Sequence, residues 1–134
     1  MSIVAPAQDL LMRIKNAYLA RKNTVDGVIH SQFLEAMVVL LKKYKFVRDY
    51  RIVEETPQKR FLSLVLHDVV NPAQDIPVIR LYSKPSRRRY VSYKDLKPVA
   101  WGLGIGIIST SKWLLPTHVA KKLKVGGELI AEIY

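Results

Sequence analysis

The run from Gly102 to Lys112 constrains the fold of this chain more than any other segment. It reads Gly-Leu-Gly-Ile-Gly-Ile-Ile-Ser-Thr-Ser-Lys, so an apolar, glycine-rich stretch stops at three consecutive hydroxyls and a lysine. Glycine inside a strand is typical of close approach by another backbone or of a bulge. Each hydroxyl carries a donor and an acceptor that must be satisfied, so Ser109, Thr110 and Ser111 belong where a buried strand surfaces. There they would form a hydrogen-bonding platform with the charge of Lys112 beside it.

Two other interpretations of this run are weak. Ser109 to Lys112 matches the Ser-x-x-Lys motif of penicillin-recognising enzymes, in which the motif opens a helix and is accompanied by Ser-Asp-Asn and Lys-Thr-Gly. This chain has neither companion, and its motif ends a predicted strand. A phosphate-binding loop follows a strand and opens a helix, whereas these glycines lie before and within the strand. We therefore predict no enzymatic activity, with a small Ser-Lys hydrolase as the alternative.

The charge balance favours a polyanionic partner. The chain of 134 residues has 22 Lys and Arg against 11 Asp and Glu, a net charge of +11, and such an excess usually indicates a polyanion. Residues 1–77 carry eleven basic and eight acidic side chains, a net of +3, and residues 78–134 carry eleven and three, a net of +8. We expect the second part to bind nucleic acid, with an anionic membrane surface as the lesser candidate.

No cofactor, metal site or membrane partner is predicted. The absence of cysteine excludes disulfides and thiolate metal sites, and His30, His67 and His118 lie too far apart for metal-like spacing. The longest apolar runs, such as residues 36–41, are far shorter than a membrane span. The N-terminus has no charged region leading into a long apolar core, so a signal peptide is not expected. We expect a soluble intracellular protein.

Periodicity and turn residues predict a mixed α/β fold of the α+β type, with two small lobes over residues 1–70 and 77–134. The first lobe is an α-α-β-β unit of two helices and a β-hairpin, and the second is an antiparallel sheet with a short helix. The helices are expected over Asp9–Arg21, Ser31–Tyr44 and Thr117–Leu123, with a helix or turn over Leu96–Trp101. The strands are expected over Phe46–Val53, Arg60–Leu66, Pro77–Tyr82, Gly104–Ser111 and Glu128–Tyr134.

Residues 84–94 form the densest positive patch of the chain, Lys-Pro-Ser-Arg-Arg-Arg-Tyr-Val-Ser-Tyr-Lys. Arginine presents a flat fork to phosphate oxygens, and Tyr90 and Tyr93 offer stacking faces to exposed bases. A solvated charged loop is the alternative. Three adjacent arginines followed by tyrosines, in the part of the chain with a net charge of +8, predict contact with RNA.

Several motifs together resemble a known family. Gly102–Ile105 and Ser109–Lys112, followed at matching spacing by Gly126-Gly127-Glu128, are similar to the ribosomal protein S8 family of the small subunit. The segment Asp9–Ala17 resembles the opening helix of that family. Ser83-Lys84-Pro85, with Arg88 and Tyr90, resembles a further element, so the likeness covers nearly the whole chain.

The resemblance implies a C-terminal lobe that binds an irregular internal loop in a helix of the central domain of small-subunit ribosomal RNA and is needed for assembly. It also implies neighbouring small-subunit proteins as partners and, in bacterial members, a messenger RNA of the protein's own operon. Such a protein would work in the cytoplasm, or in a mitochondrion or plastid if it is organellar. With the arginine patch, the predicted RNA-binding residues are Ser109, Thr110, Ser111, Lys112, Lys84, Arg87, Arg88, Arg89, Tyr90, Gly126, Gly127 and Glu128, with Arg13, Lys15 and Asn16 of the opening helix as a second contact.

The chain departs from the family pattern at two places. Trp113 replaces the glycine that follows Ser-Thr-Ser-Lys, and with Leu114 and Leu115 it forms an apolar rim. This rim either packs within the lobe or docks a neighbouring protein or RNA segment. Thr117 stands where the family has aspartate, and we expect it to cap the short helix. Glu128 either accepts from base amines, orients the lysine or pairs within the lobe.

Overall fold

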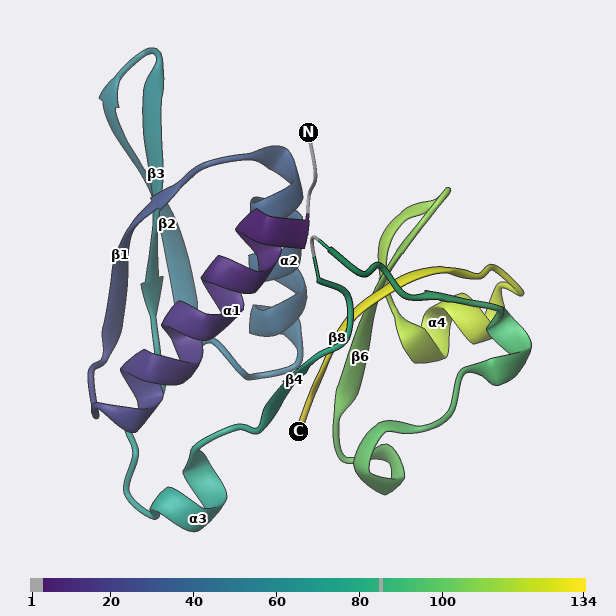
Figure 1. Cartoon of the computed structure of the whole chain (residues 1–134). Coiled ribbons are helices and arrows are strands. Elements are labelled where there is room, and N and C mark those ends of the chain that lie inside the picture. The colour runs from purple at the N-terminus through teal and green to yellow at the C-terminus, as the bar shows by residue number, and fades with distance from the viewer. Residues whose placement is uncertain (1–3, 85) are drawn as a thin grey trace. The chain divides into compact units, whose positions relative to one another are not determined.

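The computed structural model describes residues 4–84 and 86–134 (Figure 1). It divides into two compact units, one of Asp9–Pro77 and the other of Met1–Gln8 with Val78–Tyr134, called here the N-terminal and C-terminal lobes. Pro85 of the Ser-Lys-Pro element and residues 1–3 lie outside the described residues. Both lobes contain helices and antiparallel strands, so the predicted mixed class is confirmed.

Helices α1 (Val4–Leu19) and α2 (Gln32–Lys43) are both amphipathic, as predicted. The prediction that α1 begins at Asp9 is wrong, because the helix starts five residues earlier. Pro6 lies in its first turn, where a missing N–H breaks no helical hydrogen bond. Ser31 caps α2 by accepting a hydrogen bond from the N–H of Leu34 at 3.1 Å. The buried stripes of the two helices supply much of the core of the N-terminal lobe.

The sheet of this lobe has the order β1-β3-β2 and is antiparallel (Figure 1). The predicted hairpin is present as β2 (Asp49–Thr56) and β3 (Lys59–Val65). Strand β1 (Thr24–Ile29) was not predicted, because Asp and Gly interrupt its apolar alternation and its register with β3 shifts at that point. The lobe therefore has an α-β-α-β-β order.

Two local features complete the N-terminal lobe. Tyr18 is buried, and its hydroxyl donates to the carbonyl of Phe46 at 2.6 Å. This burial raises the pKa of Tyr18. The predicted connection contains the short helix α3 (Pro72–Asp75), and the N–H groups of Asn71 and Val70 lower the pKa of Asp75 by donating to its carboxylate.

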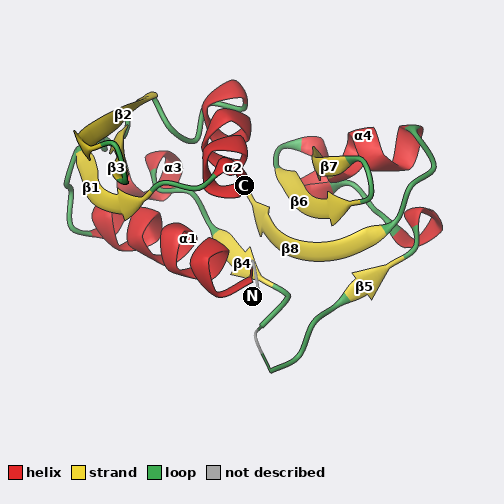
Figure 2. Cartoon of the chain, turned by 90° about the horizontal axis from the view of Figure 1, so that it is seen from above, coloured by secondary structure: helices red, strands yellow, loops and turns green. Residues whose placement is uncertain are grey.

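The C-terminal lobe is built on one antiparallel sheet, in which β8 pairs with three other strands. Strand β6 lies along one edge of β8, while β4 and β5 follow one another along the other edge (Figure 2). Strand β7 pairs with the outer edge of β6. The five strands are β4 (Ile79–Leu81), β5 (Tyr90–Val91), β6 (Ile105–Thr110), β7 (Trp113–Pro116) and β8 (Gly127–Ile133).

Three short helices accompany this sheet: η1 (Tyr93–Asp95), η2 (Val99–Gly102) and α4 (Thr117–Lys122). Leu96, Ile108 and Ala120 form a buried apolar cluster that joins α4 to β6. The prediction that Thr117 caps α4 is wrong. Pro116 precedes the helix without a side-chain cap, and Thr117 is buried within its first turn.

The glycines of the opening run allow the close approach that the sequence predicted. A Cβ atom on Gly104 would collide with the carbonyl of Ile133 and with Tyr134. A Cβ atom on Gly106 would lie 2.5 Å from Cγ2 of Thr117 and 2.7 Å from its hydroxyl oxygen. Strand β6 can therefore pack tightly against β8 and α4 only because these positions carry no side chain.

Candidate nucleic-acid interface

Strand pairing brings three predicted site residues into one row across the C-terminal sheet. Tyr90 of β5 pairs with Glu128 of β8, which pairs on its other side with Ser109 of β6. Residues directly opposite one another in an antiparallel sheet project from the same face, and neighbouring strands lie about 4.8 Å apart. Tyr90 is 68% exposed, so an aromatic residue stands at one end of these three and a hydroxyl at the other.

The three hydroxyls of the platform have different roles. Thr110 donates to the carbonyl of Trp113 at 2.9 Å and accepts from the N–H of Lys112 at 3.0 Å, so its hydroxyl closes the hairpin between β6 and β7. Within the described part of the chain, no side-chain hydrogen bond engages the hydroxyls of Ser109 and Ser111. Two of the three hydroxyls therefore remain available to a ligand, and Thr110 shapes the turn that presents them.

The Gly126-Gly127 pair allows β5 and β6 to approach the start of β8. A Cβ atom on Gly127 would collide with the carbonyl oxygen of Ser109, and one on Gly126 would lie 2.6 Å from the carbonyl oxygen of Val91. Both obstacles are backbone atoms of paired strands and cannot rotate away. The close pairing of these strands at the platform therefore requires that neither position carries a side chain.

The arginine loop, residues 82–89, leaves the sheet after β4 and returns at β5 along the same edge of β8. Ser83 is 0% exposed and fastens both ends of this loop. Its hydroxyl donates to the carbonyl of Leu129 at 2.7 Å and accepts from the N–H of Arg89 at 3.0 Å. Lys84 and Arg87 exchange backbone hydrogen bonds of 2.9 and 3.0 Å nearer the tip. We did not predict this role for Ser83, because its partner Leu129 is remote in sequence.

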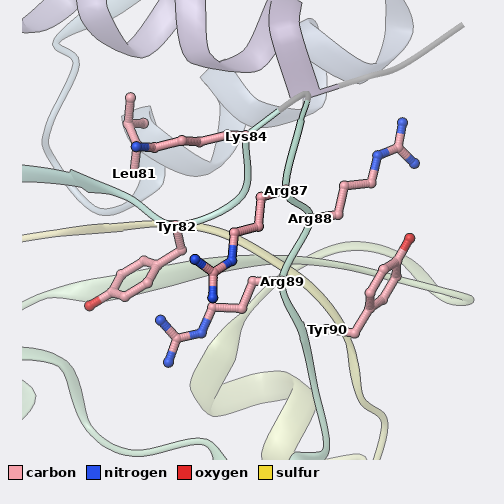
Figure 3. Close-up of a pocket in the computed structure, with 7 residues that line it drawn as sticks. All are labelled: Leu81, Tyr82, Lys84, Arg87, Arg88, Arg89 and Tyr90. Carbon is pink, nitrogen blue, oxygen red and sulfur yellow. The ribbon is translucent and has the colours of Figure 1, made fainter.

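The side chains of the loop surround an open cavity of about 680 Å³ (Figure 3). The guanidinium of Arg89 lies 4.9 Å from the ring centroid of Tyr82, on the opposite side of the loop from Tyr90 (Figure 3). The cavity is lined by Leu81, Tyr82, Lys84, Arg87, Arg88, Arg89 and Tyr90. Four cations and two aromatic rings suit it to phosphates and flat rings.

Glu128 is the buried acceptor of the row, with only 5% of its surface exposed. Its Oε1 atom lies 3.9 Å from Nε of Arg88, which balances the charge without a hydrogen bond. Among the described residues, this oxygen has no hydrogen-bond donor. A buried acceptor without a donor is costly, so Glu128 combines pairing within the lobe with unused capacity to accept from a ligand.

The second predicted contact lies in the other lobe, on α1. The guanidinium of Arg13 donates to the backbone carbonyl of Asp26, which ties α1 to β1. Lys15 is half-buried and Asn16 is exposed. Strand pairing therefore unites Tyr90, Glu128 and Ser109 within the C-terminal lobe, whereas the three residues of α1 belong to the N-terminal lobe.

The C-terminal sheet carries hydroxyls, an exposed tyrosine and, at one end, the arginine loop. These features define a class, the small basic α+β proteins whose surface chemistry suits a nucleic-acid interface. Comparison with known proteins identifies the particular family. The chain belongs to the ribosomal protein S8 family, whose model matches residues 5–134. The resemblance seen in the sequence is thereby confirmed, and the family is one of ribosomal proteins and not of enzymes.

Relatives match along the whole chain. One is the small ribosomal subunit protein uS8 of Dictyoglomus turgidum, 36% identical over 134 residues that cover 100% of both chains. Another, of the same description, is from Persephonella marina, 38% identical over 136 residues that cover 98% of this chain and 99% of the relative. In the described residues, no helix has both the length and the apolar character that crossing a membrane requires.

Proposed function

We propose that this protein is a structural component of the small ribosomal subunit that binds ribosomal RNA through its C-terminal lobe. The observation that carries this proposal is the row Tyr90–Glu128–Ser109, which sets a ring, a buried acceptor and an available hydroxyl side by side. The family and the net charge of +8 on residues 78–134 support it. The bound element would be a helix of the central domain, and the positive lobe would help that RNA to fold during assembly.

The chemistry of the row suits an irregular RNA loop better than a regular helix. The major groove of A-form RNA is too deep and narrow for side chains to read, so specific recognition targets unpaired or distorted bases. The short hydroxyls of Ser109 and Ser111 can reach base edges or 2′-hydroxyls, and Glu128 can accept from a base amine. The arginine loop would then neutralise the flanking phosphates.

The platform can be tested with two RNA hairpins, one with an irregular internal loop from the central domain and one with the same stem fully paired. Ser109→Ala and Ser111→Ala should each weaken binding to the first RNA by roughly 0.5–3 kcal/mol and leave binding to the second unchanged. Ser86→Ala, on the exposed arginine loop, is the matched control and should change neither affinity. Equal losses on both RNAs would show that the hydroxyls do not recognise the loop.

Two further contacts belong to this proposal. Lys15 and Asn16 of α1 would touch RNA independently of the platform, so Lys15→Gln should weaken binding to full-length ribosomal RNA more than to the isolated hairpin. A messenger RNA with the same irregular loop would bind the same platform. Crosslinking in cells followed by sequencing of the bound RNA would identify both targets, together with neighbouring proteins of the subunit.

A further inference from the structure

The backbone of Trp113 adopts a conformation that large side chains rarely take. Its φ is 80°, in the left-handed region that favours glycine. It follows the two-residue turn Ser111-Lys112 and pairs with Thr110. The hydroxyl of Thr110 fixes this hairpin through the carbonyl of Trp113 and the N–H of Lys112, so the turn itself does not require an indole.

The apolar rim of the hairpin divides into packed and exposed residues. Leu114 is buried, and Leu115 packs against the cluster formed by Leu96, Ile108 and Ala120. Trp113 keeps 53% of its surface exposed. Packing within the lobe therefore accounts for the two leucines, whereas about half of the surface of Trp113 is open to solvent.

Trp113 begins the edge strand β7, directly after the turn that carries Ser111 and Lys112. Val91, Gly127, Thr110 and Trp113 form a second row across β5, β8, β6 and β7, one residue along from the row of Ser109. Successive residues of a strand face opposite sides of the sheet, so the row of Thr110 and Trp113 faces away from the row of Tyr90 and Ser109. An exposed Trp113 therefore adjoins Ser111 and Lys112 at the hairpin turn, and not the face that carries Tyr90.

We propose that Trp113 is a stacking residue for an unpaired nucleobase of the RNA bound at the platform, an inference that rests on the proposed function. Every base has a flat π-face, so stacking on an indole adds affinity with little dependence on base identity. The hydroxyls of Ser109 and Ser111 would select the loop, while Trp113 holds a base that the loop extrudes past the hairpin turn.

Affinity measurements on the whole protein test the inference. Stacking on an aromatic side chain is worth enough that Trp113→Leu should weaken binding to the irregular hairpin about 5- to 100-fold, whereas Trp113→Phe should retain most of the affinity. Trp101→Leu is the matched control. It removes the other of the two tryptophans, which is 99% exposed in the same lobe, and should leave the affinity unchanged.

Fluorescence gives a second readout that does not depend on altering Trp113. In the Trp101→Phe variant the remaining indole is Trp113, and its emission should be quenched when the irregular hairpin binds. Unchanged emission at saturating RNA, with equal affinity for Trp113→Leu, would overturn the inference and leave the proposed function intact. Loss of incorporation into subunits without loss of RNA affinity would assign the indole to a protein neighbour and also overturn it. If the unaltered protein does not prefer the irregular hairpin, the proposed function itself fails.

Discussion

At the scale of single residues, Ser83 shows how a buried hydroxyl can organise a charged surface. The loop it fastens carries Lys84 and three arginines whose mutual repulsion would otherwise favour an open ensemble. One side chain satisfies a carbonyl of β8 and an N–H at the start of β5, so the loop is closed at its base. The base of the loop that carries these cations is consequently fixed by the lobe itself.

Replacing Ser83 by alanine should therefore cost both stability and affinity. The N–H of Arg89 and the carbonyl of Leu129 each lose a buried partner, so we expect a loss of about 1–3 kcal/mol in the free energy of unfolding, measured by urea denaturation. Binding to the irregular hairpin should weaken as the loop opens. Ser86→Ala removes a hydroxyl from the exposed part of the same loop and should change neither quantity. A Ser83→Ala protein as stable as the unaltered chain would contradict this role.

At the scale of elements, the predictable parts are those whose pattern is local. Helices α1 and α2 and strand β6 were expected from their own periodicity. Strands β5 and β7 were not, because one is two residues long and the other contains Pro116 and starts in a left-handed conformation. Both exist because a longer strand lies beside them and satisfies their hydrogen bonds.

The sequence indicates where the candidate site lies, but not which role each of its residues has. Ser109, Thr110 and Ser111 stand together in the chain, and their residue types do not reveal which hydroxyl the turn will use. That division depends on the hairpin between β6 and β7, which the sequence did not predict. The role of Ser83 was hidden for the same physical reason, since its partners become neighbours only when the sheet forms.

The contact between β6 and α4 allows a test of element packing. Gly106→Ala would place a methyl group within 2.5 Å of the buried Thr117 side chain, and overpacking of this kind costs typically 1–3 kcal/mol. Thr117→Ala removes the two nearest atoms, so the double variant should lose less stability than the sum of the single variants. Thermal unfolding of all four proteins measures this coupling. Additive losses would mean that Gly106 is required for another reason.

At the scale of the whole molecule, the dominant property is the uneven distribution of charge. The net charge of +11 is divided into +3 on residues 1–77 and +8 on residues 78–134. In the C-terminal lobe the candidate phosphate contacts are concentrated on the arginine loop and the hairpin turn. Arg88 is partly engaged by Glu128 and Arg89 by the ring of Tyr82, so these two cations are also held in place by the lobe.

RNA affinity should consequently fall steeply with salt. If Lys84, Arg87, Arg88, Arg89 and Lys112 each neutralise a phosphate, a plot of log K against log salt concentration should have a slope of roughly −3.5 to −4.5. Arg87→Gln should reduce the magnitude of this slope by about 0.7–0.9. Lys122→Gln, at the end of α4, carries the same change in net charge and should leave the slope unchanged. A flat salt dependence would rule out the arginine loop as the phosphate-binding element.

The pairing of β8 with β4, β5 and β6 has a consequence for the order in which the protein matures. Translation proceeds from the N-terminus, so β8 leaves the exit tunnel after every strand that it joins. Strands β1, β2 and β3 of the N-terminal lobe are synthesised much earlier and can form their sheet while synthesis continues. The second sheet cannot close until residue 133 has emerged, and a nascent chain stalled before residue 127 would display its arginines without the surface that arranges them.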